Sequence, residues 1–203
     1  MRGFYFITDA RLSSAGNISD VRNAMAAKVK IIQYRDKQAS TKEMYEEAVQ
    51  LRRICKNVTF LINDRIDIAL SADADGVHLG QDDLPYATAR KLLGKKKIIG
   101  VTVHSVEEAQ EAQRLGADYV SISPIFATKT KIDAGIPKGI TLIKKIREYI
   151  SIPIVAIGGL NLSNAAEVIK AGADGLCAIS VVVTKRDVKA EIEKFQELFG
   201  YKK

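Results

Sequence analysis

Two acidic clusters in the first half of the chain have the residue types and the spacing of a divalent-cation site. Asn63 and Asp64 directly follow one apolar run, and Gln81, Asp82 and Asp83 follow the next. Carboxylates resist burial without a partner, so they do little for stability just beyond buried strands. Mg²⁺ takes one or two carboxylates with water and substrate phosphate oxygens. The pattern predicts Mg²⁺ at Asp64 and Asp83, with Asp82 as a competitor and helix caps as the alternative.

Cationic residues that suit a phosphorylated substrate follow an earlier apolar run. Gln33, Arg35 and Lys37 alternate along the chain, so an extended backbone would turn all three the same way. A guanidinium binds phosphate through paired hydrogen bonds, and an ammonium binds it as a point charge. A strand end with solvated charges is the alternative interpretation.

Further polar groups follow the later apolar runs. The longest connection, residues 124–139, carries Thr128, Thr130 and Lys131, and a loop of this length on a compact domain is usually a functional lid or disordered. Gly158 and Gly159 follow the seventh run, where backbone amides can bind an anion, as do the loops after strands seven and eight of many parallel barrels. Two further hydroxyls, those of Thr102 and Ser180, follow the fifth run and end the eighth.

Eight apolar runs must position these residues. They span residues 3–8, 29–35, 58–63, 75–79, 97–101, 118–123, 152–157 and 174–180. Nearly continuous hydrophobicity is typical of parallel strands that are covered on both faces. Segments of helical period lie between the runs. Ser40 and Ser105 open predicted capping boxes, Ser163 is expected to cap the seventh helix, and Pro85 suits the first turn of the fourth.

The alternation of strands and helices favours a closed barrel. Eight such units in 203 residues predict one α/β domain over residues 1–203, a (β/α)₈ TIM barrel, with a doubly wound open sheet as the alternative. Residues that follow the strands would then share the carboxyl-terminal mouth. Three similar segments, 72–76, 115–118 and 171–175, join helix ends to strand starts, and we interpret them as structural.

Composition excludes several classes of function. No apolar run reaches 18 residues, and the N-terminus lacks the pattern of a signal peptide, so we expect a cytoplasmic protein without a membrane partner. The net charge of +7 comes from dispersed lysines without interleaved aromatics, which favours a small polyanionic substrate over nucleic acid.

Cys55 and Cys177 are expected to be reduced core residues. His78 and His104 lack zinc spacing, and we interpret them as a barrel or interface residue and a loop or cap residue.

Seven stretches taken together resemble the thiamine-phosphate synthase family. In chain order they are YFITD, QYRDK, NDRIDIALSADADGVHLGQDD, GVTVHS, PIFATKTK, IPIVAIGGL and GADGLCAIS, and they span all eight strand–helix units. The resemblance implies a TIM-barrel transferase that joins a pyrimidine methyl diphosphate to a thiazole phosphate and releases diphosphate. It implies a dissociative reaction with Mg²⁺ as the cofactor, and it is compatible with a homo-oligomer.

The resemblance also assigns residues to ligands. The pyrimidine diphosphate would be held by Gln33, Tyr34, Arg35, Asp36, Lys37, Asn63, Thr102 and Lys131. The thiazole phosphate would be held by Thr128, Lys129, Thr130, Gly158, Ile179 and Ser180, with Gly159 alongside. Arg35, Lys37, Thr102 and Lys131 would act on the reacting groups, and Asp64 and Asp83 would hold Mg²⁺. Tyr34 and Thr102 stand where the family commonly has Leu and Ser.

Three other functions compete with this interpretation. A thiazole tautomerase of the same barrel would not need both metal carboxylates and the diphosphate-binding set. A phosphoribosylanthranilate isomerase, or another phosphate-binding barrel, would use an acid–base pair in place of a metal clamp. A non-catalytic binding protein would bind the same precursors without turnover.

Overall fold

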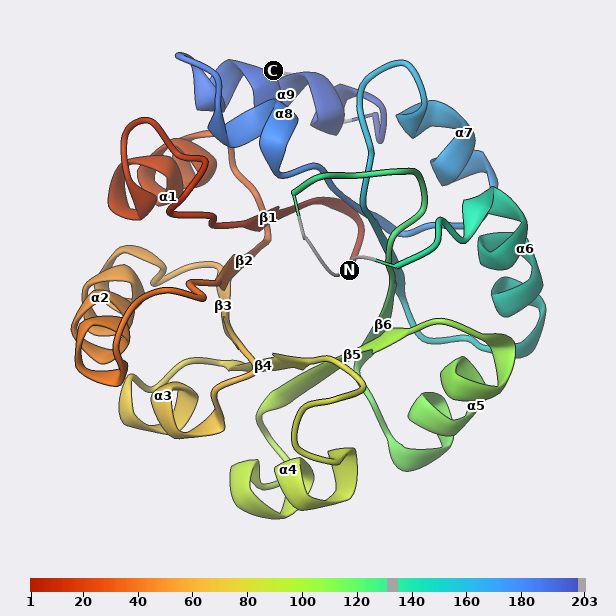
Figure 1. Cartoon of the computed structure of the whole chain (residues 1–203), viewed down its shortest axis with the longest axis horizontal. Coiled ribbons are helices and arrows are strands. Elements are labelled where there is room, and N and C mark those ends of the chain that lie inside the picture. The colour runs from red at the N-terminus through yellow and green to blue at the C-terminus, as the bar shows by residue number, and fades with distance from the viewer. Residues whose placement is uncertain (131–134, 201–203) are drawn as a thin grey trace.

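Eight parallel strands close into a ring in which each strand is hydrogen-bonded to its neighbours in chain order. The computed structural model describes residues 1–130 and 135–200 (Figure 1). The strands are β1 (Gly3–Ile7), β2 (Ile31–Tyr34), β3 (Thr59–Asn63), β4 (Gly76–Leu79), β5 (Ile98–Val103), β6 (Tyr119–Ile122), β7 (Ile154–Ile157) and β8 (Gly175–Cys177). Pairing of β1 with β8 closes the ring. The predicted (β/α)₈ barrel is therefore confirmed, and the open sheet is excluded.

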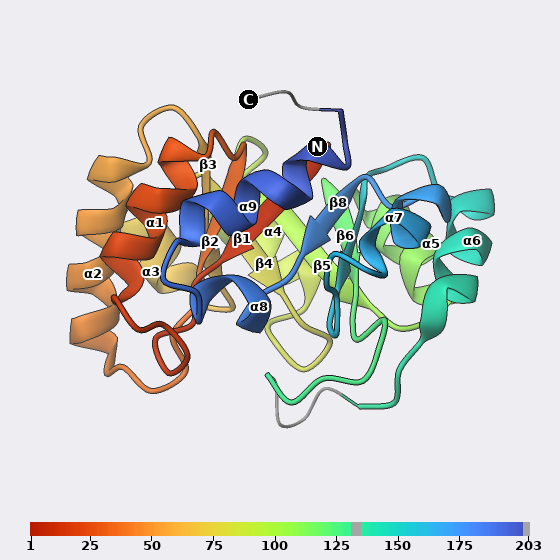
Figure 2. The same cartoon turned by 90° about the horizontal axis from the view of Figure 1, so that it is seen from above.

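Helices surround the ring and cover its outer face (Figure 1). They are α1 (Asn17–Ala26), α2 (Thr41–Ile54), α3 (Ile66–Ser71), α4 (Tyr86–Leu93), α5 (Val106–Leu115), α6 (Gly139–Tyr149), α7 (Ala165–Lys170), α8 (Ser180–Val183) and α9 (Val188–Glu197). The N-terminus and the end of α9 lie at one mouth, and the described part of the connection that follows β6 lies at the other (Figure 2). Among the helices of the described residues, none has the length and apolarity needed to cross a membrane.

Burial on both faces explains why the strands read as continuous apolar runs. Outward strand residues join the helices in one large buried cluster, and inward residues form a second, smaller one. The predicted face of α2 is buried at Met44, Ala48 and Leu51, and Cys55 just beyond the helix is also buried. Both cysteines are free and buried, as expected.

The helix starts match the sequence predictions only in part. Ser40 and Glu43 form a full capping box at α2. Ser105 accepts from the amide of Glu108, but the Glu108 carboxylate accepts from the His104 amide, so the second box is incomplete. The prediction for Ser163 is wrong, because its amide donates to the Asn161 side chain before α7 begins.

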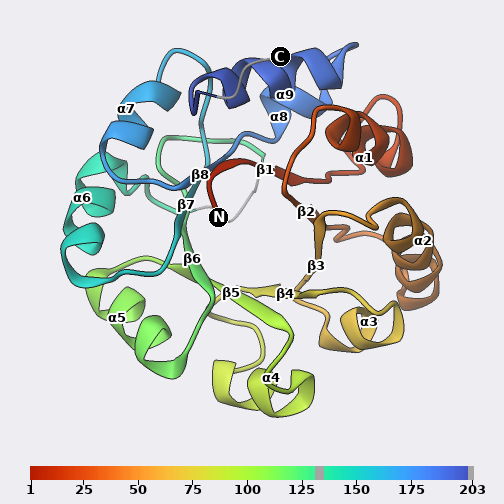
Figure 3. The same cartoon turned by 180° about the vertical axis from the view of Figure 1, so that it is seen from behind.

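The three repeated segments clamp neighbouring strands together at the amino-terminal mouth of the barrel, the mouth that faces the viewer in Figure 3. In each, the aspartate just before a strand accepts a hydrogen bond from an amide of the preceding strand and pairs with an arginine from an earlier helix. The aspartates are Asp75, Asp118 and Asp174, the amides belong to Phe60, Ile99 and Ile154, and the arginines are Arg52, Arg90 and Arg147. The amide-to-carboxylate distances are 2.8, 2.8 and 2.9 Å. The structural interpretation of the repeat is confirmed.

We predict that Asp174→Asn destabilises the barrel. The substitution weakens the contact to Arg147, at 2.7 Å, and the charge-assisted bond from the Ile154 amide. Hydrogen bonds to charged groups typically contribute ~1.5–3 kcal/mol, and the partial exposure of the carboxylate lowers this to about 1 kcal/mol. Urea denaturation should show that decrease in the free energy of unfolding. Asp73→Asn is the control, since the Asp73 carboxylate is exposed and pairs with Lys97 at the surface; an equal loss there would contradict a clamp at Asp174.

Candidate active site

A cavity of about 760 Å³ opens at the carboxyl-terminal mouth of the barrel, the mouth into which Figure 1 looks. Most of the residues predicted to form the site line it. They are Gln33, Arg35, Lys37, Asn63, Asp64, Asp83, Thr102, Thr128, Thr130, Gly158, Gly159, Ile179 and Ser180. Asp82 also lines it, as do His78 and His104. Lys131 lies outside the described residues.

Three of the predicted site residues do not line the cavity. Tyr34 faces outward and is buried between the strands and the helices, where burial, and then the neighbouring Glu47, raise its pKa. The Asp36 carboxylate accepts from the amides of Gln38 and Ala39, so it shapes the loop after β2. Lys129 is also absent from the cavity wall. Strand alternation explains Tyr34, because Gln33 and Arg35 on either side of it point to the other face.

Asp64 and Asp83 meet at this mouth and do not cap helices. The helix after Asp64 has Arg65 at its N-cap, and the helix after Asp83 has Pro85 there. The backbone of Asp64 is in the left-handed region, with φ of 60°, a conformation that few residues other than glycine, Asn and Asp adopt. Burial raises the pKa of Asp83, and the adjacent Asp64 carboxylate raises it further. The two carboxylates are therefore close enough to repel one another.

Oxygen ligands at this position fit Mg²⁺ better than a softer metal. Asp64 and Asp83 supply two carboxylates, and the cavity wall beside them adds the side-chain amides of Asn63 and Gln81. No group of three or more His, Cys, Asp or Glu residues that could enclose a metal exists among residues 1–130 and 135–200. A cation held here would thus keep coordination positions for water and ligand oxygens, which is how Mg²⁺ is usually bound.

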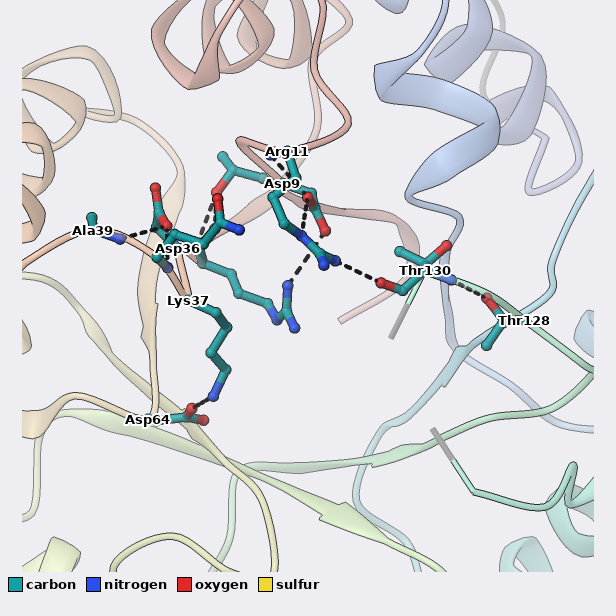
Figure 4. Close-up of polar contacts among 11 residues, drawn as sticks. Asp9, Arg11, Asp36, Lys37, Ala39, Asp64, Thr128 and Thr130 are labelled. Carbon is teal, nitrogen blue, oxygen red and sulfur yellow. Dashed lines mark hydrogen bonds and ion pairs between the residues drawn. The ribbon is translucent and has the colours of Figure 1, made fainter. Parts of the chain in front are cut away.

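Two cationic side chains, those of Arg35 and Lys37, line the same cavity as these carboxylates. The ammonium of Lys37 contacts the Asp64 carboxylate across the mouth (Figure 4). The guanidinium of Arg35 lies 3.4 Å from Asp9, a carboxylate with only 1% of its side chain exposed. Main-chain groups of Arg35 are also held, by the Thr8 hydroxyl at 2.9 and 3.1 Å. Arg35 is thus oriented by the two residues that directly follow β1 before any ligand binds.

Arg11 is a cavity residue that the sequence predictions did not include. Its guanidinium donates to the backbone carbonyl of Thr130, at 2.9 Å, and lies 3.7 Å from Asp9 (Figure 4). It therefore joins the loop after β1 to the loop after β6. The rule that rim residues follow the strands would have found Asp9 and Arg11, because both come directly after the first apolar run.

The opposite side of the cavity is formed by a glycine pair against the β6–α6 loop. Gly158 and Gly159 have φ of 96° and 65°, which side chains rarely tolerate. A Cβ atom on Gly158 would lie 2.7 Å from Pro124, and one on Gly159 would lie 2.6 Å from the Ala127 carbonyl oxygen. Only glycine brings the backbone this close to the loop. Ser180, at the start of α8, completes this wall, and the phosphate site expected here stays a prediction.

Polar side chains fill the barrel interior beneath the cavity. Gln33 donates to the hydroxyl of Tyr5, which lies 2.7 Å from that of Tyr119. His78 contacts Tyr119 through Nδ1, at 2.8 Å, and Thr102 through Nε2, at 2.9 Å. Burial lowers the pKa of His78 to about 4, so the ring is neutral near pH 7. His78 is confirmed as a barrel residue. Tyr5 and Tyr119 were missed, although polar groups in apolar runs are a readable signal.

We predict that Asp83→Asn stabilises the metal-free protein near pH 7. Because the pKa of Asp83 is raised on folding, the native state binds more protons than the unfolded state, and stability falls as pH rises through the folded pKa. The amide removes that loss and can still accept from the Gly80 amide. Thermal unfolding should show a higher Tm for the variant at pH 7. The difference should disappear at pH values below the ordinary aspartate pKa of the unfolded chain, and a lower Tm at pH 7 would contradict the repulsion.

Comparison with known proteins identifies the family. A family model described as thiamine monophosphate synthase matches residues 4–182. The chain is 54% identical over 196 residues to the thiamine-phosphate synthase of Methanosarcina barkeri, covering 96% of this chain and 89% of the relative. It is 48% identical over 197 residues to that of Chloroflexus aurantiacus, covering 96% and 91%. A solved structure of thiamine phosphate pyrophosphorylase from Pyrococcus furiosus matches with a TM-score of 0.89 at 40% identity, covering 98% and 95%. The chain belongs to the thiamine monophosphate synthase family.

Proposed function

We propose that this cavity condenses a pyrimidine methyl diphosphate with a thiazole phosphate to give thiamine phosphate and diphosphate, with Mg²⁺ bound at Asp64 and Asp83. Family membership and relatives at about half identity over nearly the whole chain support thiamine-phosphate synthase activity, a transferase reaction. The observation that carries the mechanism is the meeting of Asp64, Asp83, Arg35 and Lys37 at one mouth, opposite the glycine pair. That arrangement suits two phosphorylated substrates in one cavity.

The reaction breaks one bond and forms another. The carbon–oxygen bond between the pyrimidine methylene and the diphosphate breaks, and the bonding electrons leave with the diphosphate. The thiazole nitrogen then donates its lone pair to the methylene carbon. Neither step needs a protein nucleophile or a strong base, so the neutral His78 is compatible with this chemistry.

Charge on the departing diphosphate is the main problem that the protein must solve. Arg35, held by Asp9, can donate paired hydrogen bonds to phosphate oxygens without reorganising. Lys37 is bound to Asp64 in the free protein and would transfer its contact to the diphosphate. Thr102 adds a hydroxyl at the cavity wall. The contribution expected of Lys131 stays a prediction.

Bound Mg²⁺ would supply charge neutralisation on the diphosphate oxygens, with Asp64 and Asp83 as its protein ligands. The raised pKa of Asp83 reflects its burial and then its proximity to Asp64, and a cation would relieve that repulsion. The thiazole phosphate would lie against Gly158, Gly159 and Ser180, where backbone amides and a hydroxyl are available.

A thiazole isomerase of the same barrel is the second candidate. It would bind a phosphate at Gly158, Gly159 and Ser180, but its reaction would not require the paired carboxylates of Asp64 and Asp83. Their closeness at the mouth favours the synthase. A cytoplasmic location and a homo-oligomer also stay predictions.

We predict that product forms only with Mg²⁺ present. The purified protein should be given both phosphorylated precursors with and without Mg²⁺, and thiamine phosphate and free diphosphate should be quantified. Both products should appear in equal amounts in the Mg²⁺ sample. Release of diphosphate without thiamine phosphate would indicate hydrolysis, and no product in either sample of folded protein would reject the synthase.

We further predict that Asp64→Ala and Asp83→Ala each lower turnover by at least about a hundredfold, since each removes a ligand that neutralises leaving-group charge. Circular dichroism should show an intact fold. Asp82→Ala, which changes a neighbouring acid in the same cavity wall, is the matched control and should retain most activity. If Asp82→Ala is inactive and Asp83→Ala is active, then Asp82 is the metal ligand.

A further inference from the structure

Five polar side chains form one unbroken hydrogen-bonded chain through the barrel interior. It runs from Gln33 in β2 through Tyr5 in β1, Tyr119 in β6 and His78 in β4 to Thr102 in β5. The successive distances are 2.6, 2.7, 2.8 and 2.9 Å. Gln33, His78 and Thr102 line the cavity, whereas the two tyrosines are fully buried beneath it. The chain therefore leaves the cavity at one point and returns to it at another.

Each link in the chain determines the direction of the next. The Tyr5 hydroxyl accepts from the Gln33 amide, and its other hydrogen-bond partner among the described residues is the Tyr119 hydroxyl, so Tyr5 donates its single proton to Tyr119. Tyr119 in turn donates to Nδ1 of His78. A neutral imidazole that accepts at Nδ1 carries its proton on Nε2. That proton is donated to Thr102, with Ser121 at 3.2 Å as a second acceptor. Thr102 keeps its own proton for a group in the cavity or for the Ser121 hydroxyl, 3.1 Å away.

Rotation of the Gln33 amide would reverse every link. With the carbonyl oxygen toward Tyr5, Tyr5 would donate to Gln33 and Tyr119 would donate to Tyr5. His78 would then carry its proton on Nδ1, and Thr102 would donate to Nε2. In this arrangement Thr102 faces the cavity only as an acceptor.

The barrel is built to keep the chain continuous. Tyr119 stacks on the His78 ring, with centroids 5.4 Å apart, and meets Tyr5 edge-on at 5.9 Å. Gly100, beside Tyr119 in the β5–β6 register, makes room for this ring, because a Cβ there would lie 2.0 Å from Cζ of Tyr119. Both tyrosines are fully buried, so neither hydroxyl can exchange its side-chain partner for bulk water.

We propose that Gln33 and Thr102 are coupled through this chain, so that the ligand group bound by Gln33 sets the tautomer of His78 and decides whether Thr102 donates or accepts. Tyr5, Tyr119 and His78 are then positioning residues for the reaction. The proposal deepens the proposed function, but its test reads the tautomer directly and does not require activity.

The test is ¹⁵N NMR of the imidazole nitrogens, because the protein sequence contains only two histidines, His78 and His104. Comparison with His104→Gln assigns the signal of His78. The wild-type protein should show a neutral ring protonated on Nε2. Gln33→Glu at about pH 9, well above the usual glutamate pKa, presents only acceptors to Tyr5 and should move the proton to Nδ1.

Two variants separate transmission along the chain from a change in local charge. Gln81→Glu makes the same substitution in the same cavity. Gln81 donates to the backbone carbonyl of Thr102 and not to a side chain of the hydrogen-bonded chain, so the His78 proton should stay on Nε2. Gln33→Glu combined with Tyr5→Phe cuts the chain, so no direction is imposed through Tyr5 and Nε2 protonation should reappear. A proton that stays on Nε2 in Gln33→Glu, or moves equally in Gln81→Glu, would overturn the proposal.

A further variant covers the case in which Gln33→Glu does not fold. Gln33→Met removes the donor to Tyr5 without adding charge, so neither direction is imposed and both His78 tautomers should be populated. A single Nε2 tautomer in folded Gln33→Met would also overturn the proposal. Inactivity of the wild-type enzyme toward its precursors would reject the proposed function but would leave these spectra unaffected.

Discussion

Closure of a parallel sheet places the end of every strand at the same mouth, and the candidate site depends on this constraint. The hydrogen bonds between β1 and β8 complete the ring, so the residues after β2, β3, β4 and β5 converge although they are far apart in sequence. The same closure separates two tasks. The aspartate clamps act at the amino-terminal mouth, and the cavity occupies the other. Substitutions in the cavity can therefore change ligand binding without touching these clamps.

Electrostatics at the cavity mouth are balanced in the free protein and are suited to change on ligand binding. Asp64 and Asp83 repel one another, and Lys37 partly offsets this by contacting Asp64. A metal ion between the carboxylates would replace Lys37 as the partner of Asp64. A diphosphate would in turn replace Asp64 as the partner of Lys37. Arg35 differs from Lys37, because buried Asp9 holds it in place. The Arg35 side chain is thus held in one position, whereas the Lys37 side chain is able to exchange one partner for another.

Residue patterns predicted the barrel and most of the cavity wall, because both follow from periodicities of single strands. Apolar runs define the strands, and polar residues just after them define the rim. Contacts that depend on three-dimensional neighbours were not predictable in this way. Asp36 has the charge expected at the rim, but its carboxylate accepts hydrogen bonds from the Gln38 and Ala39 amides. Ser163 does not cap α7, because it lies in a turn that is held by the Asn161 side chain. The link between Tyr5 and Tyr119 joins residues 114 positions apart, and no local pattern encodes it.

The bond from Arg11 to the Thr130 carbonyl spans two loops that flank the cavity. Because it uses a backbone acceptor, it does not depend on the side chain at position 130, and sequence drift there would leave it intact. Because its donor also faces Asp9, which orients Arg35, displacement of the second loop would alter Asp9 and, through it, the position of the Arg35 guanidinium. The position of one loop at the mouth is thereby mechanically linked to the orientation of a cationic side chain in the cavity wall.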